Sequence, residues 1–299
     1  MSSRESDQTA PRTGTRNTYA HGQDLADTTV DWNGAAEDYG RHRQPFPDVV
    51  ADLLRAHGIG VPGQLVADVG TGVGTPALQI ARGTTAGAPT VIGIDPAREM
   101  LAVARRRAQD AGVDLDLRVG TAEATGLDDG SVDAVTAGQC WHWFNTARAV
   151  PEFRRVLRSG GRVGICLMEW RPDLDPDGPF GRTIDVLRRN TSFRFDGPFE
   201  PTQHRAGWLA DLTPHGFVEV GWSHLRFHAT YTHDGWRGRL RASTWVAATQ
   251  DTAVVAAIDA QLADALQGAP EPLQLPHDLV VGVFQQSQAA TTGVVSGQT

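Results

Sequence analysis

The stretch "VADVGTGVGT", Val66 to Thr75, joins a short apolar run to glycines at three alternate positions, Gly70, Gly72 and Gly74. A helical pattern follows directly. Glycine lets the chain turn sharply, and it leaves no Cβ between the peptide groups and a ligand. In an open parallel sheet, ligands bind beyond the carboxyl ends of the strands. The stretch therefore predicts a buried strand, a ligand-binding turn and a helix.

The segments around this stretch alternate between strand and helix patterns. Five strands are predicted, from apolar runs at 64–70, 89–96, 131–140 and 162–170 and from an alternating pattern at 113–120, with helices between most of them. Such alternation is typical of a parallel sheet with helices on both faces. Two later strands, at 216–231 and 277–285, raise the expected number to seven. The predicted fold is α/β: a doubly wound, Rossmann-like, mostly parallel seven-stranded sheet with a C-terminal antiparallel strand.

The length and composition favour one elaborated domain. The chain has 299 residues, of which 40% are hydrophobic and 21% charged, enough for one sizeable core. Residues 1–28 and 287–299 are poor in aliphatic side chains and are expected to be tails, the first of them disordered. The domain is expected to span 29–286, with N-terminal lid helices at 29–57. Pro, Gly and Asp gather around one helical piece at 180–190 and predict an inserted cap at 171–214.

The charged residues and the cysteines exclude several classes of function. All 27 basic residues are arginine, so the chain has no lysine for a Schiff base or for a Walker-type phosphate site. The net charge of −8 argues against nucleic-acid binding. No apolar run is long enough to span a membrane. Cys140 and Cys166 show no pairing or metal-ligand spacing, and we expect reduced thiols, no metal and a cytoplasmic protein whose partner is a small molecule.

Four ordered motifs between Trp32 and Trp170 make the interpretation more specific. They are "VADVGTGVGTPALQIA", "VIGIDPAREMLAVARRRA", "GTAEATGLDDGSVDAVTAGQCWHWFN" and "EFRRVLRSGGRVGI". In this order and spacing they resemble class I S-adenosylmethionine-dependent methyltransferases. The small-molecule branch of that family also carries a Tyr-x-x-x-Arg segment, here Tyr39 and Arg43. The resemblance implies S-adenosylmethionine as cofactor and a small-molecule acceptor.

The resemblance also implies roles for particular residues. Asp68 and the three glycines would surround the methionine part of the cofactor, and Asp95 would bind the ribose hydroxyls. The adenine would lie near Met100, Thr121, Ala122 and Glu123, with Thr121 standing where aspartate is common. Gln139 would place its backbone against the methionine amine. Tyr39 and Arg43 would belong to a lid over the cofactor.

A candidate catalytic residue follows the fourth predicted strand. His142, in "QCWHWF", is expected at the catalytic edge of the sheet, where an imidazole could act as a general base. The alternative interpretation is that His142 has a structural role and caps the next helix or packs against it. The neighbouring Trp141, Trp143 and Phe144 could likewise line an apolar acceptor site or belong to the core.

Three functions remain open on the sequence. The first is methyl transfer to an O, C or N atom of a metabolite, aromatic or carboxylate-bearing, in specialised metabolism. The second keeps the cofactor site on the same fold without transfer, as in a cyclisation or simple binding. The third is a nicotinamide oxidoreductase, which the glycine spacing disfavours because Thr75 stands where that fingerprint needs its third glycine. The oligomeric state is not predicted.

Overall fold

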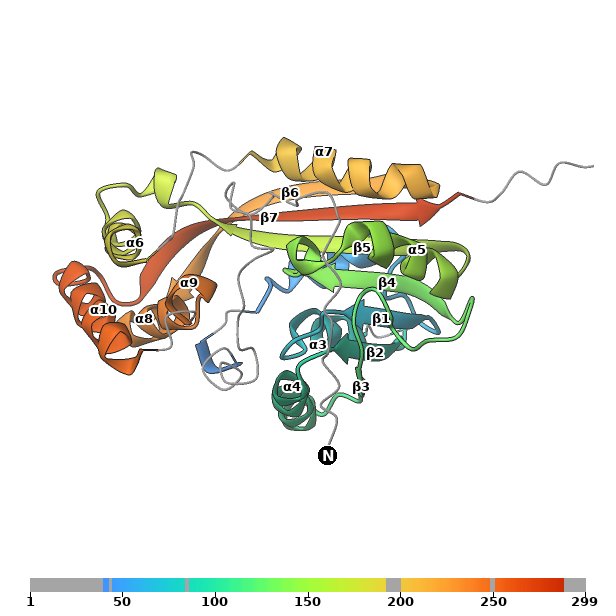
Figure 1. Ribbon diagram of the computed structural model, residues 1–299, viewed down its shortest axis with the longest axis horizontal. Helices are drawn as coiled ribbons and strands as arrows, with labels where there is room; N and C mark the ends of the chain where they lie inside the picture. Colours follow the sequence, from blue (N-terminus) through green and yellow to red (C-terminus); the bar gives the residue numbers. More distant parts are fainter. Residues whose placement is uncertain (1–39, 43–44, 84–85, 192–199, 248–250, 288–299) are drawn as a thin grey trace, which may run out of the picture.

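The computed structural model describes residues 40–42, 45–83, 86–191, 200–247 and 251–287 (Figure 1). One sheet of seven strands runs in the order β3, β2, β1, β4, β5, β7, β6. The first five strands are mutually parallel, and β7 is antiparallel to both of its neighbours. The predicted α/β class, the seven strands and the antiparallel C-terminal strand are confirmed.

The parallel half of the sheet contains the strands that the sequence patterns predicted. They are β1 (Leu65–Val69), β2 (Thr90–Asp95), β3 (Asp116–Val119), β4 (Val132–Gly138) and β5 (Leu157–Trp170). Successive side chains of a strand point to opposite faces of a sheet. On β1, Val66 accordingly joins one buried cluster while Ala67 and Val69 join another. Both faces of the inner strands are covered, which is why β1, β2 and β4 are nearly continuous in apolar residues, whereas the edge strand β3 is largely exposed.

Helices from different parts of the chain cover the two faces. Val50 and Leu54 of α2 (Val49–Ala56) and Ala77 and Ile80 of α3 (Thr75–Ala81) belong to one buried cluster. Phe153 of α5 (Thr146–Val156) lies in the cluster on the other face. The helix α4 (Arg98–Ala111) packs along β2 and β3. This arrangement leaves the loops at the carboxyl ends of β1, β2 and β4 along one edge.

The last two strands are long and extend beyond the parallel part of the sheet. They are β6 (Phe217–Tyr231) and β7 (Leu273–Gln286), and four helices gather at one end of them (Figure 1). These helices are α6 (Pro179–Asn190), α8 (His233–Arg241), α9 (Thr244–Ala247) and α10 (Thr252–Ala265). Trp170, Phe180 and Trp236 pack at the centre of their separate buried cluster. The molecule therefore has a second core, built around the far end of β6 and β7.

The helix α7 (Pro201–Leu212) is the element that the sequence pattern did not reveal, because only one helical piece was expected between 171 and 214. It lies along β6 and β7 (Figure 1). Its buried residues are His204, Gly207, Trp208 and Leu212. Two of these are polar or lack a side chain, so the helical repeat of apolar residues that identifies an amphipathic helix is missing.

Short 3-10 turns complete the described chain. They are η2 (Trp141–Trp143), η3 (Pro172–Leu174) and η4 (Thr213–His215). The proposed tail at 1–28, the segments 29–39 and 43–44 of the proposed lid, and all of the C-terminal tail except Ser287 fall outside the described residues. Within the described ranges, the helices lack the length and apolar character needed to cross a membrane.

Candidate functional site

The glycine loop after β1 is held by the neighbouring strand. Gly70 and Thr71 donate their N–H groups to the carbonyl oxygen of Ile94, at 2.8 and 3.0 Å. Gly70 has φ +69°, and a Cβ there would lie 2.8 Å from Sγ of Cys140, so a side chain would displace the loop after β4. Gly72, with φ +53°, faces open space instead: no atom of the described residues lies within 4 Å of its hypothetical Cβ. The loop therefore presents bare backbone toward the edge of the sheet, and Gly74 then leads into α3.

Asp68, near the end of β1, fixes this loop through a hydrogen bond. Its carboxylate is inaccessible to solvent and accepts hydrogen bonds from the hydroxyls of Thr71 and Thr136, each at 2.7 Å. Burial raises the pKa of Asp68 to about 6, against the opposing effect of these hydrogen bonds. Both oxygens are engaged by the protein, so Asp68 fixes the shape of the loop and the end of β4.

Asp95, at the end of β2, faces the same loop. Its Oδ2 accepts the N–H of Gly72 at 2.8 Å, and its Oδ1 accepts the N–H of Ala97 at 2.9 Å. Burial raises the pKa of Asp95, while these two backbone hydrogen bonds lower it. Each carboxylate oxygen has a second lone pair. Asp95 can therefore accept two further hydrogen bonds, as a ribose diol would donate.

The residues expected at the adenine lie around the ends of β2 and β3. Met100 is buried with Val73 at the start of α4. Ala122 is buried, whereas Thr121 is exposed. Glu123 accepts the backbone N–H of Asn145 at 2.8 Å, which joins this segment to the start of α5. Tyr39 and Arg43 lie outside the described residues, so the structure does not place the lid.

Gln139 directly follows β4 and has an unusual backbone. Its φ is +62°, and it is the one residue other than glycine with a positive φ in the described part of the chain. Its side-chain amide pairs with the backbone of Met168, donating at 3.0 Å and accepting at 2.8 Å. Non-glycine residues in this conformation are uncommon and cluster at functional sites. The pairing to β5 holds the turn that leads from β4 into η2.

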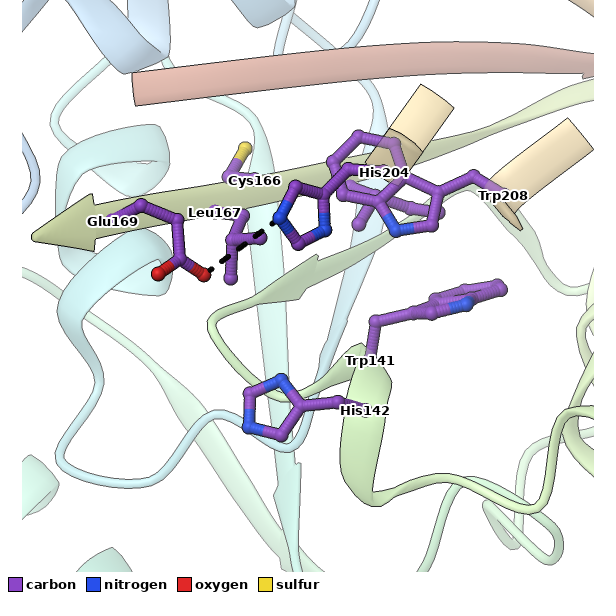
Figure 2. A pocket seen from close by; sticks show the side chains of 8 residues that line it. Trp141, His142, Cys166, Leu167, Glu169, His204 and Trp208 are labelled. Atoms are coloured by element: carbon purple, nitrogen blue, oxygen red, sulfur yellow. Dashed lines mark ion pairs between the residues drawn. The ribbon is translucent and has the colours of Figure 1, made fainter. Parts of the chain in front are cut away.

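A pocket lies beyond that turn. Its empty space of about 270 Å³ includes open solvent. Three elements supply its walls (Figure 2). The lining residues are Trp141 and His142 of η2, Ile165, Cys166, Leu167 and Glu169 of β5, and His204 and Trp208 of α7. His142, the candidate catalytic residue, therefore lines a pocket. Its ring packs on Trp143, with 5.4 Å between the ring centroids.

Hydrogen bonds fix the wall of the pocket to its surroundings. Asp211 of α7 accepts from Nε1 of Trp141 at 2.9 Å and from the hydroxyl of Thr146 at 3.1 Å. Burial raises the pKa of Asp211, and these two hydrogen bonds oppose that effect. Cys140 donates its thiol to the carbonyl of Val69 at 3.2 Å, which ties the start of η2 to the end of β1. The pocket and the glycine loop are therefore parts of one edge.

The two cysteines do not form a disulfide, since both are free and buried. Burial raises the pKa of each thiol, and the nearby carboxylate of Asp68 adds to the effect. Both thiols are therefore protonated and unreactive at neutral pH. In the part of the chain that the structure describes, no three His, Cys, Asp or Glu side chains gather as metal ligands.

The geometry of this edge fits the cofactor that the resemblance implies. The open space at Gly72 is where a Cβ would obstruct a ligand lying against the backbone. The spare lone pairs of Asp95 suit ribose hydroxyls, and Asp95 also holds the N–H of Gly72. S-adenosylmethionine carries no phosphate, so the glycine loop needs no lysine of the kind that a phosphate-binding loop uses.

Comparisons with known proteins agree with this geometry. The model of the methyltransferase domain family matches residues 67–165. An uncharacterised methyltransferase of Mycobacterium tuberculosis is 33% identical over 202 residues, which cover 65% of this chain and 76% of that protein.

Solved structures give the same fold. A protein from Anaeromyxobacter dehalogenans, assigned as a type II methyltransferase, has a TM-score of 0.52 at 25% identity, covering 81% of this chain and 97% of that one. The 4+2 cyclase SpnF has a TM-score of 0.52 at 21% identity, covering 83% of this chain and 84% of that one. With S-adenosylmethionine as its cofactor, the chain belongs to the class I S-adenosylmethionine-dependent methyltransferases.

Proposed function

We propose that the enzyme transfers the methyl group to an O, C or N atom of a small-molecule acceptor by in-line displacement. One observation carries this proposal: the pocket of η2, β5 and α7 begins directly after Gln139, on the same edge as the glycine loop. The thiol of Cys140 joins the two parts through the carbonyl of Val69. An acceptor in the pocket would therefore lie beside a cofactor on the loop.

The proposed cofactor site uses residues from four loops. The residues are Asp68, Gly70, Gly72, Gly74, Asp95, Met100, Thr121, Ala122, Glu123 and Gln139, with Tyr39 and Arg43 in a lid. Asp95 would accept from the ribose hydroxyls, and Gly72 would lie against the methionine part. Asp68 would act through the loop that it holds, because both of its oxygens already accept from threonines.

The protein's main contribution to the reaction is to align the reacting groups. When bound, S-adenosylmethionine supplies a methyl group on a sulfonium sulfur, which is a good leaving group. Alignment of two reacting groups lowers the barrier by replacing an encounter in solution with a fixed geometry. Trp141 and Trp208 give the pocket apolar walls that exclude water from the acceptor. We propose that His142, the middle residue of η2 and part of the pocket wall, also contacts the acceptor.

A mass measurement separates transfer from the other functions. The enzyme is incubated with S-adenosylmethionine carrying a deuterated methyl group and a panel of small phenols, enols, amines and carboxylic acids. Transfer predicts a product heavier by one labelled methyl group, in equal amount to S-adenosylhomocysteine. The SpnF structure shows that this fold also occurs in a cyclase. A product with the mass of its substrate, formed without S-adenosylhomocysteine, would contradict transfer and favour such a reaction.

A further inference from the structure

Two ionisable side chains face each other in the otherwise mostly apolar pocket. Glu169 is near the end of β5 and His204 is on α7, and they are only 5% and 4% exposed. Figure 2 shows the imidazole and the carboxylate directed toward one another from these two elements. Nε2 of His204 lies 3.9 Å from Oε1 of Glu169. Neither residue was singled out by the sequence patterns.

The separation of the pair leaves a position for an oxygen atom. A distance of 3.9 Å is too long for a direct hydrogen bond. An oxygen about 2.8 Å from both atoms, a normal hydrogen-bond length, would complete a triangle with an angle near a right angle at that oxygen. A hydroxyl group there could donate its proton to one partner and interact with the other. The nearby indoles of Trp141 and Trp208 would contact the rest of a flat apolar molecule.

The charges around the pair favour proton acceptance by the imidazole. Across from Glu169, β7 presents Asp278, whose charge is balanced by Arg171 and Arg226, with His224 also 3.3 Å away. The other ionisable groups lining the pocket are Cys166, held neutral by burial, and His142 on η2. Glu169 is thus the carboxylate that faces His204. A carboxylate close to an imidazole stabilises its protonated form.

We propose that His204 is the general base for an acceptor hydroxyl and that Glu169 stabilises the imidazolium that results; this rests on the proposed methyl transfer. The O–H bond breaks and its proton moves to the imidazole. The electron pair of the oxygen forms the bond to the methyl carbon, while the pair of the methyl–sulfur bond stays on sulfur. The proton then leaves the imidazole for solvent.

The same arrangement selects the class of acceptor. The acceptor is a phenol or a comparable enol, with a hydroxyl that needs deprotonation. A carboxylate acceptor is disfavoured because Glu169 would repel its charge and because no arginine lines the pocket among the described residues. His142 is less suited to be the base, because its ring is more exposed and packs on Trp143. It remains a contact for the acceptor at the side of the pocket.

The test compares His204→Gln with the wild type on phenol and on 4-nitrophenol, a far more acidic phenol that is substantially ionised near neutral pH. With phenol, His204→Gln should lower kcat/KM by about 100-fold or more, the usual contribution of a general base. With 4-nitrophenol the loss should be much smaller. Affinity for S-adenosylhomocysteine should not change. His228→Gln, at an exposed histidine of β6, is the matched control and should behave as the wild type.

A second readout follows the imidazole itself by NMR in the complex with S-adenosylhomocysteine. Glu169→Gln should lower the pKa of His204, and phenol but not benzoate should shift the His204 resonance. Equal losses with both phenols would overturn the base assignment, as would a His204 resonance that responds to benzoate alone. Efficient labelled transfer to benzoate and none to phenol would do so as well, while leaving methyl transfer established. Absence of any transfer would instead contradict the proposed function, and the NMR titration would still decide the assignment.

Discussion

At the scale of single residues, the cofactor edge depends on backbone that carries no side chain. Gly72 and Gly130 have φ of +53° and +57°, and at both positions a Cβ would meet no described atom within 4 Å. Gly72 lies on the proposed cofactor surface, whereas Gly130 precedes β4 at the opposite end of that strand. Alanine substitutions at the two positions therefore separate the loss of stability caused by the backbone conformation from a loss of ligand affinity.

Gly72→Ala and Gly130→Ala should destabilise the protein by similar amounts, about 1–2 kcal/mol, because alanine is strained in the left-handed region. Only Gly72→Ala should weaken binding of S-adenosylhomocysteine, because only its Cβ would lie on the proposed cofactor surface. The expected loss is about tenfold or more, which corresponds to about 1.4 kcal/mol of binding free energy. Urea unfolding and titration calorimetry measure the two effects. Equal affinities in the two variants would remove Gly72 from the cofactor surface.

Asp68 predicts a dependence of stability on pH. Its pKa is about 6 in the folded protein against an ordinary 3.8, so the folded state binds a proton more tightly than the unfolded chain. This contribution is complete below pH 3.8 and is lost as the pH rises to about 6, and the shift corresponds to about 3 kcal/mol.

The comparison with Asp68→Asn isolates this contribution. Between pH 4 and about 6 the free energy of unfolding of the wild type should fall relative to that of the variant. Urea unfolding at several pH values measures the difference. If the two proteins follow parallel curves across this range, the carboxyl does not titrate as described.

At the scale of elements, local patterns predicted the first strands and the glycine loop but not α7. The turn after β1 and the acidic residue at the end of β2 depend on short-range patterns, which the sequence contains directly. The pair of His204 and Glu169 forms only when α7 packs on the sheet, and the two residues are 35 positions apart. Polar residues that face a pocket also erase the apolar repeat that would identify their helix. The positive φ of Gln139 is likewise invisible, because glutamine does not favour it.

A buried ion cluster joins the three last strands of the sheet. Asp278 of β7 accepts from Arg226 of β6 at 2.9 Å and from Arg171, which directly follows β5. Its side chain is inaccessible to solvent. Burial would raise the pKa of Asp278, but the hydrogen bonds from Arg226 and Arg171 outweigh burial and hold it below its ordinary value. The cluster holds together the end of the sheet that carries Glu169.

Asp278→Ala should cost roughly 1.5–3 kcal/mol, the range for hydrogen bonds to charged groups. Arg171 and Arg226 lose a shared partner, although Arg171 keeps its pair with Asp173 and Arg226 is exposed to solvent. Asp185→Ala removes one member of an exposed pair with Arg188 on α6, and it should cost no more than about 1 kcal/mol. Urea unfolding of both variants gives the comparison. A loss from Asp278→Ala as small as that from Asp185→Ala would show that the cluster does not hold the strands.

At the scale of the whole molecule, the parallel half of the sheet carries the proposed cofactor edge, and a second core lies at the far end of β6 and β7. The fold class followed from the alternation of strand and helix patterns, because that alternation is repeated along the chain. The packing of α6 with α8 and α10 could not be read in the same way, since it joins segments far apart in the sequence. The proposed acceptor pocket is lined by residues of η2, β5 and α7, outside this second core.

The most direct test of the account is the thermal unfolding of the wild-type protein with S-adenosylhomocysteine and, separately, with NAD. At a free ligand concentration of about a hundred times Kd, a ligand of the native state adds about 2.7 kcal/mol of stability. For a protein of this size that is a rise in Tm of roughly 4–5 °C. The account predicts this rise with S-adenosylhomocysteine and none with NAD. A rise with NAD alone would contradict it, and the glycine loop would then be a dinucleotide site.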